Sequence, residues 1–249
     1  MRTANPALNG NTFGRPDHAS AASSGRMTIN GTVNKTGVLL VILLIPATWI
    51  WGQVYGAWQS PAAGALMMGG LIGGLVFALV TIFKKEWSPV TAPLYAACEG
   101  LVLGGISALM EMRFPGIVIQ AVALTAGTLL CLLLAYRSGL IRATENFKLG
   151  IVAATGAIAL IYLAPFILGF FGVRIPFIHE NGLIGIGFSL VVVAVAALNL
   201  VLDFDFIEQG AEHGAPRYME WYAAFGLMVT LVWLYLEILR LLAKLNSRR

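Results

Sequence analysis

The feature that most constrains the fold is a series of apolar runs, each long enough to cross a lipid bilayer as a helix. About 20 helical residues span the roughly 30 Å of hydrocarbon in a membrane. Seven segments of about this length follow one another, at residues 37–56, 62–83, 91–110, 117–136, 149–172, 182–202 and 218–242. Their apolar residues are continuous rather than alternating, which favours helices over the strands of an outer-membrane barrel.

The composition agrees with a chain that lies in lipid. Hydrophobic residues make up 58% of the sequence and charged residues only 11%, whereas about 25% of the residues of an average soluble domain are charged. We therefore predict an all-α polytopic membrane protein in which residues 37–249 form one domain of seven transmembrane helices. Residues 1–36 are polar and contain no apolar segment typical of a signal peptide. We expect them to form a flexible N-terminal arm rather than a cleaved leader.

The basic residues predict the orientation of the helices. Loops on the cytoplasmic side of a membrane carry an excess of lysine and arginine. With seven crossings and a cytoplasmic N-terminus, ten basic residues lie inside and six outside. The basic residues from Arg240 onward fall on the minority side, which leaves open whether the last apolar segment crosses or re-enters. The net charge of +4 then reflects topology and requires no nucleic-acid partner.

Acidic residues concentrate near the C-terminus. Six of the twelve acids lie within residues 198–240, namely Asp203, Asp205, Glu208, Glu212, Glu220 and Glu237. A carboxylate at membrane depth requires a partner, a proton or an ion, and therefore indicates a functional site. Asn199 and Asp203 are four residues apart and share a helix face. We expect Asp203 and Asp205 to end the sixth helix at its cytoplasmic end, where acids oppose the helix dipole.

Two carboxylates, Glu99 and Glu237, lie inside predicted helices. Glu99 is about eight residues into its span, with no basic residue within two turns. It is either a neutral side chain hydrogen-bonded to a neighbouring helix or a station for ion or proton passage. Glu237 shares a face of the last helix with Thr230, seven residues earlier. It also lies three residues before Arg240, with which it can form a local ion pair.

The sequence lacks the residue patterns of known intramembrane proteases. An intramembrane serine protease would need a serine and a histidine in facing helices, and the nearest element, GISA at 105–108, has no such histidine. An intramembrane aspartyl protease would need a second aspartate in a Gly-x-Gly-Asp context, which is missing. The three histidines lie outside the apolar runs without metal-ligand spacing. We expect a protein that is not an enzyme and that holds no cofactor.

Four stretches carry a resemblance to a known family. They are NPALNGNTF at 5–13, MTINGTVNKTGVLL at 27–40, YAACEGLVLG at 95–104, and residues 202–242, which begin LDFDFIEQG and end LYLEILRLL. In their order and spacing, along essentially the whole chain, they resemble the transmembrane Bax inhibitor motif family (Bax inhibitor/YccA-like). The match is closest to its bacterial branch, which has an N-terminal NPAL element. The resemblance implies a seven-helix fold with the last helix surrounded by the other six.

The resemblance also implies an activity. Characterised relatives are described as pH-sensitive calcium leak channels, in which aspartates on the sixth and seventh helices sense protons and control opening. The first aspartate lies in a pattern like Tyr-Asp-x-x-x-Ile, where Asp203 takes the aspartate position and Leu202 replaces the tyrosine. Aligning the C-terminal ends of the last helix puts the second aspartate at Thr230.

The threonine changes the expected partner of Asp203. Two carboxylates close together cannot both ionise, which is how such a pair holds a proton. With Thr230 in the second position, the resemblance leaves Asp203 to couple instead to Glu237, Glu220 or Glu99.

Our leading expectation is therefore a cation leak in a bacterial inner membrane, with calcium as the transported ion. Carboxylate oxygens suit calcium, and Asp203 is the candidate calcium ligand. The candidate gating residues are Asp203, Asp205, Glu99, Glu237, Glu220 and Thr230. The alternative is a non-conducting membrane protein that regulates membrane-protein quality control or stress machinery. Its N-terminal arm would then dock partner proteins, and its carboxylates would be structural.

Overall fold

The chain folds into seven long helices. A computed structural model describes residues 25–55, 61–170 and 182–247. The helices are α2 (Ile29–Tyr55), α3 (Pro61–Phe83), α4 (Ser88–Arg113), α5 (Ile117–Arg137), α6 (Glu145–Phe170), α7 (Leu183–Glu212) and α8 (Met219–Asn246), with a 3-10 turn, η1 (Lys85–Trp87), before α4. All seven are long and apolar enough to cross a membrane, and these ranges contain no named strand. The predicted fold class is confirmed.

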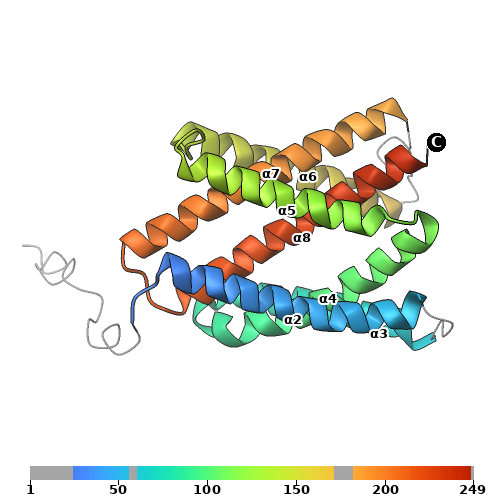
Figure 1. Ribbon diagram of the computed structural model, residues 1–249, viewed down its shortest axis with the longest axis horizontal. Coiled ribbons are helices and arrows are strands. Elements are labelled where there is room, and N and C mark those ends of the chain that lie inside the picture. The colour runs from blue at the N-terminus through green and yellow to red at the C-terminus, as the bar shows by residue number, and fades with distance from the viewer. Residues whose placement is uncertain (1–24, 56–60, 171–181, 248–249) are drawn as a thin grey trace, which may run out of the picture.

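The last helix lies between two groups of helices. Figure 1 shows α2, α3 and α4 on one side of α8 and α5, α6 and α7 on the other. α8 packs directly against α2, α4, α5 and α7, whereas α3 packs mainly on α4 and α6 mainly on α7. Met228 and Leu234, near the middle of α8, are completely buried. The predicted central position of the last helix is confirmed, with four neighbours forming the inner shell and two helices outside it.

The first helix is longer than its apolar run. α2 begins at Ile29 rather than at Gly37 because its buried face starts with threonines, which a hydropathy count passes over. The hydroxyl of Thr32 donates to the carbonyl of Thr28 at 3.1 Å, and that of Thr36 donates to Thr32 at 3.0 Å. Neither buried hydroxyl is left unpaired. Residues 1–24 of the predicted arm lie outside the described residues.

The sixth crossing is also longer than predicted. α7 continues to Glu212, so the expectation that Asp203 and Asp205 end this helix is wrong. Phe204 and Ile207 lie one turn apart and both pack into the core around α8, which extends the helix beyond the aspartates. Asp203 therefore lies in the body of α7, away from the helix end where the dipole acts.

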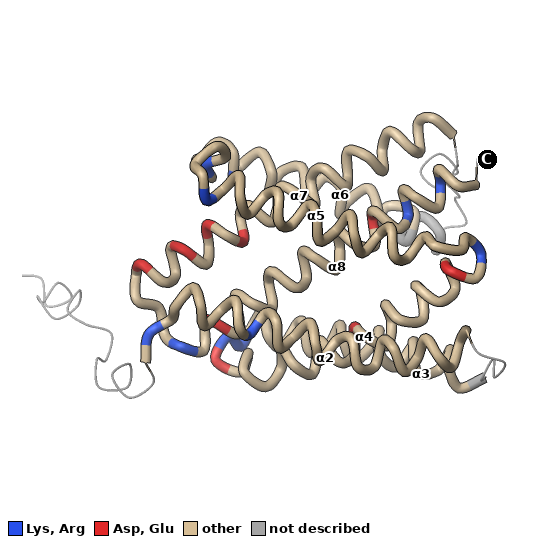
Figure 2. Tube along the Cα trace, in the orientation of Figure 1, with Lys and Arg blue, Asp and Glu red and all other residues tan. Residues whose placement is uncertain are grey.

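Charged residues mark the two ends of the bundle. Figure 2 shows lysines, arginines and acids gathered at both ends, with few between them. α8 is one continuous helix that runs from the end where α2 begins to the opposite end, where the C-terminus lies (Figure 1). The last apolar segment therefore crosses the bundle and does not turn back.

Candidate functional site

Asp203 lies where α7 meets α8. Its Oδ2 atom is the one buried side-chain nitrogen or oxygen of the described residues that lacks a hydrogen-bond partner. Thr230 of α8 is the side chain that interacts with this carboxyl. The Thr230 hydroxyl also donates to the carbonyl of Gly226 at 3.3 Å. The fold thus brings together the two positions that the family resemblance pairs, here an aspartate and a threonine.

Glu220, at the start of α8, is fully partnered. It is 3% exposed and accepts hydrogen bonds from the backbone N–H of Thr28 at 2.9 Å and from its hydroxyl at 3.0 Å. It also forms an ion pair with Lys35 of α2. The Lys35 ammonium lies 5.6 Å from the ring centroid of Trp221. These contacts tie the beginning of α2 to the beginning of α8.

A glycine allows this close approach. A Cβ atom at Gly31 would overlap the carboxylate oxygens of Glu220. We call Thr28, Gly31, Lys35 and Glu220 the α2–α8 latch. The sequence analysis counted Glu220 among the gating candidates and missed its partners. The signal was present in MTINGTVNKTG, where a glycine and a lysine four residues later share one helix face.

The chain beside the latch adds backbone pairing. The N–H of Met27 donates to the carbonyl of Ala215 at 2.7 Å. Arg26 and Pro216 form an isolated antiparallel bridge. The segment that enters α2 is therefore fastened to the loop that enters α8, which explains why the latch residues meet although they lie far apart in sequence.

Glu237 belongs to a second cluster, near the other end of α8. It is 2% exposed and pairs with Arg240 at 2.8 Å, so the predicted local ion pair is confirmed. Tyr162 of α6 donates its hydroxyl proton to this carboxylate, whose oxygens lie 3.0 and 3.1 Å away. Arg240 in turn donates to the Tyr162 oxygen at 2.7 Å. Glu237 is thus a bond between helices, made through a tyrosine that sequence reasoning missed.

Lys244 closes the same end of the bundle. Its ammonium is buried and donates to the carbonyl of Gly185 at 3.0 Å and to the hydroxyl of Ser189 at 2.9 Å. Both acceptors belong to the first turns of α7. A lysine near the end of α8 therefore holds α7 beside it.

Glu99 lies in the interface between α3 and α4. It is half-buried, interacts with Tyr95 one turn earlier on α4, and lies beside Gly74 of α3. The hydrogen-bond partner is on its own helix rather than on a neighbour. This position is separate from the contact between α7 and α8.

Asp205 and Glu208 lie on a different face of α7 from Asp203. Asp205 pairs with Lys148 of α6 at 2.8 Å, and Gln209 donates to it at 2.6 Å. Glu208 accepts a hydrogen bond from the Tyr136 hydroxyl of α5. Both acids therefore connect α7 to its neighbours near one end of the bundle.

The expected coupling partners of Asp203 are engaged elsewhere. Glu220 belongs to the latch, Glu237 to the Tyr162 cluster and Glu99 to the interface between α3 and α4. Among the side chains the structure describes, the interaction of Asp203 is with Thr230. The described ranges also hold no group of three or more His, Cys, Asp and Glu side chains placed to hold a metal ion.

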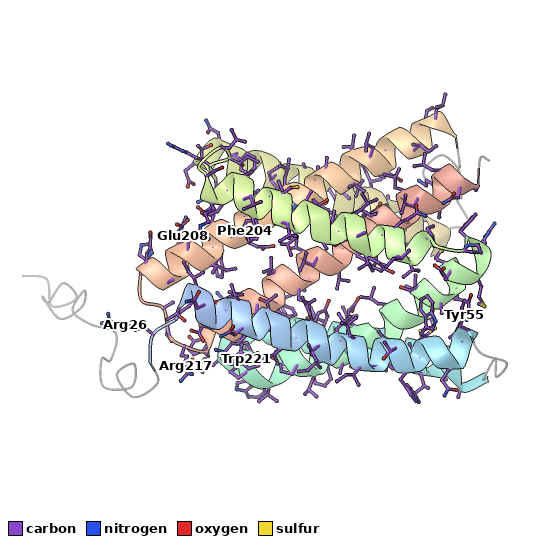
Figure 3. The ribbon with its side chains drawn as sticks, viewed as in Figure 1. Arg26, Tyr55, Phe204, Glu208, Arg217 and Trp221 are labelled. Atoms are coloured by element: carbon purple, nitrogen blue, oxygen red, sulfur yellow. The ribbon has the colours of Figure 1, made fainter. Side chains whose placement is uncertain are left out.

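Two cavities lie along the gap between α2 and α5. The larger, about 1370 Å³, is lined by the first half of α2, the second half of α5, the loop after α5 and the second half of α7. The smaller, about 370 Å³, continues along α2 and α5 over the middle of α8. Phe204 and Glu208, which line the larger cavity from α7, are labelled in Figure 3.

The sequence was compared with known proteins. No curated protein and no solved structure matches the chain. A family model described as Bax inhibitor 1 like matches residues 5–247, nearly the whole chain. Together with the seven apolar helices and the central α8, this match shows that the chain belongs to the Bax inhibitor 1 like family of multi-pass membrane proteins.

Proposed function

We propose that this protein is a pH-sensitive cation leak that passes calcium, and that Asp203 controls it through the contact between α7 and α8. The observation that carries the proposal is the buried Oδ2 atom of Asp203, which has no hydrogen-bond partner among the described residues. An ionised carboxylate in that position costs free energy unless a proton or a cation arrives. The ionised site would therefore be stabilised by binding either a proton or a cation.

The neutral form of Asp203 leaves less unpaired polarity between the helices than the ionised form does. Thr230 has one hydroxyl proton, which is directed at the Gly226 carbonyl. A protonated Asp203 can then donate its own proton to the Thr230 oxygen. When Asp203 ionises, this donor is lost, and a negative charge remains between two packed helices. Protonation therefore favours one arrangement of α7 against α8, and ionisation weakens it.

Two other buried carboxylates, Glu220 and Glu237, support this assignment by contrast. Glu220 has Lys35 and Thr28, and Glu237 has Arg240 and Tyr162. Their charges are already compensated, so a calcium ion or a proton would first have to displace a partner. At Asp203 an incoming proton or calcium ion would not have to displace a cationic side chain. A hard cation such as calcium binds carboxylate and carbonyl oxygens, and the resemblance of the sequence to calcium leak channels favours this ion.

The test is calcium flux into proteoliposomes at pH 6 and pH 8, for the wild type and for Asp203→Asn. Asparagine has the shape of a protonated aspartate and cannot ionise. We expect the wild-type flux to differ between the two pH values, and the variant to stay near the wild-type level at pH 6 under both conditions. Asp205→Asn is the matched control, because Asp205 pairs with Lys148 and should leave the pH dependence intact.

Two results would count against the proposal. If Asp203→Asn keeps the wild-type pH dependence, the gate lies elsewhere. If folded wild-type protein gives no flux above that of empty liposomes, the protein does not conduct calcium. The second result would favour the alternative function, a regulatory protein that binds partners in the membrane.

A further inference from the structure

We propose that the gap between α2 and α5 is a crevice that binds one anionic phospholipid. An acyl chain of the lipid would lie in the crevice, and its phosphate would contact Arg137 and Arg142. The crevice consists of the two cavities described above, which share Leu40 of α2 and Leu129 of α5. It goes beyond the cation leak, because neither its apolar walls nor its arginines belong to the Asp203 site.

The length and direction of the crevice suit an acyl chain. Along α2 it extends from Ile29 to Trp51, which is about 33 Å at 1.5 Å per residue. That length is comparable to the roughly 30 Å hydrocarbon core of a bilayer. The crevice follows a transmembrane helix, so it runs along the same direction as the lipid chains. An extended chain can enter it without bending.

The walls are apolar and set apart from each other. α2 and α5 are not among the helix pairs that pack together in the described part of the chain. Val33 and Leu130, which face the larger cavity from the two helices, are each 59% exposed. The floor is formed by α8, through Leu227 and Leu231. Two walls and a floor of this kind hold one chain more closely than an open helix surface does.

A glycine leaves space inside the crevice. Gly37 lines the larger cavity, and a Cβ atom built there would meet nothing within 4 Å. In a membrane such a space between apolar side chains is filled by lipid, because leaving it empty would forfeit van der Waals contact. The position also offers a way to fill the crevice by substitution.

The mouth supplies charge for a headgroup. Arg137 at the end of α5 and Arg142 in the following loop both line the larger cavity, and both are exposed. The acids at the same mouth are engaged, Asp205 with Lys148 and Glu208 with Tyr136. No ion pair of Arg137 or Arg142 occurs among the described side chains. Guanidinium groups bind phosphate through paired hydrogen bonds, which favours an anionic phospholipid over a neutral lipid.

The test measures lipid retention by the purified full-length protein in mild detergent, using native mass spectrometry. The probes are phosphatidylglycerol and phosphatidylcholine with identical acyl chains, and inorganic phosphate as a competitor. We expect the wild type to retain one phosphatidylglycerol in preference to phosphatidylcholine, and excess phosphate to leave it bound. The headgroup variant Arg137→Ala/Arg142→Ala should lose about tenfold or more in affinity. Its control, Lys84→Ala/Arg217→Ala, removes two exposed charges from the same end of the bundle but none from the crevice.

The acyl-chain part of the site has its own pair of variants. Gly37→Phe should fill the crevice and reduce retention with both arginines intact. Gly52 lies on the same helix and also has open space around its Cβ position, but it lines neither cavity. The control variant Gly52→Phe should therefore bind lipid like the wild type. Equal retention of phosphatidylglycerol by the wild type, Gly37→Phe and Arg137→Ala/Arg142→Ala would overturn the proposal. So would equal binding of the two lipids, displacement by phosphate alone, or a dimer that forms in place of the lipid complex.

Discussion

Glu220 and Asp203 both have buried carboxylate oxygens, and the fold treats the two acids in opposite ways. Glu220 receives two hydrogen bonds from Thr28 and an ion pair from Lys35. Asp203 has a buried oxygen with no partner among the described residues. The same kind of side chain thus fastens two helices at one position and has an oxygen without a partner at the other. The difference lies in the neighbouring side chains that the fold supplies.

The largest effect should follow from breaking the latch. Glu220→Gln removes the charge that Lys35 compensates, and loss of one partner of a buried pair typically costs about 3 kcal/mol or more. We expect a corresponding loss in the free energy of unfolding, measured by denaturant titration in detergent micelles. Glu86→Gln, an exposed acid in η1, makes the same charge change and should have little effect. A similar stability for the two variants would show that the latch is not structural.

A second carboxylate beside Asp203 should make stability depend on pH. Thr230→Asp places two acids together, so the folded state keeps a proton that the unfolded state releases. Stability then falls as pH rises, by up to about 1.4 kcal/mol per pH unit. The measurement is unfolding at pH 5 and pH 8, with Thr230→Asn as the uncharged control. A constant difference between the two variants at both pH values would mean that Thr230 and Asp203 do not interact.

Crowding the latch should have a smaller effect than removing its charge. Gly31→Ala puts a Cβ where the Glu220 oxygens lie, so the carboxylate must move and its hydrogen bonds lengthen. Overpacking of this kind costs about 1–3 kcal/mol. Gly52→Ala, on the same helix with open space around it, should leave stability unchanged or raise it slightly. Thermal unfolding of the two variants side by side tests this, and equal melting temperatures would contradict the observed approach.

The smallest effect on stability should come from neutralising Asp203, the proposed pH sensor. Asp203 forms no ion pair among the described residues, and asparagine keeps its shape, so we expect Asp203→Asn to change the free energy of unfolding by no more than about 1 kcal/mol. The same substitution should nevertheless abolish the pH dependence of flux. A destabilisation as large as that of Glu220→Gln would show that Asp203 is a structural acid too, and the contrast between the two sites would disappear.

Several features could be read from the sequence because they depend on local pattern. Helix number follows from the apolar runs, since each must satisfy its backbone groups within itself in lipid. The pair formed by Glu237 and Arg240 follows from a spacing of three residues on one helix. The prediction that a carboxylate beside an apolar run needs a partner, a proton or an ion follows from the cost of burying its charge. None of these inferences requires knowledge of which helices touch.

The tertiary structure decided which partner each charge has. Lys35 and Glu220 are 185 residues apart, and no helical periodicity relates positions on α2 and α8. The same is true of Tyr162 and Glu237, and of Asp203 and Thr230. The extension of α7 beyond its aspartates likewise depends on a core that Phe204 and Ile207 find only after folding. Local pattern determines helices because their hydrogen bonds are local, whereas the roles of the buried acids depend on side chains that meet only when α8 is enclosed.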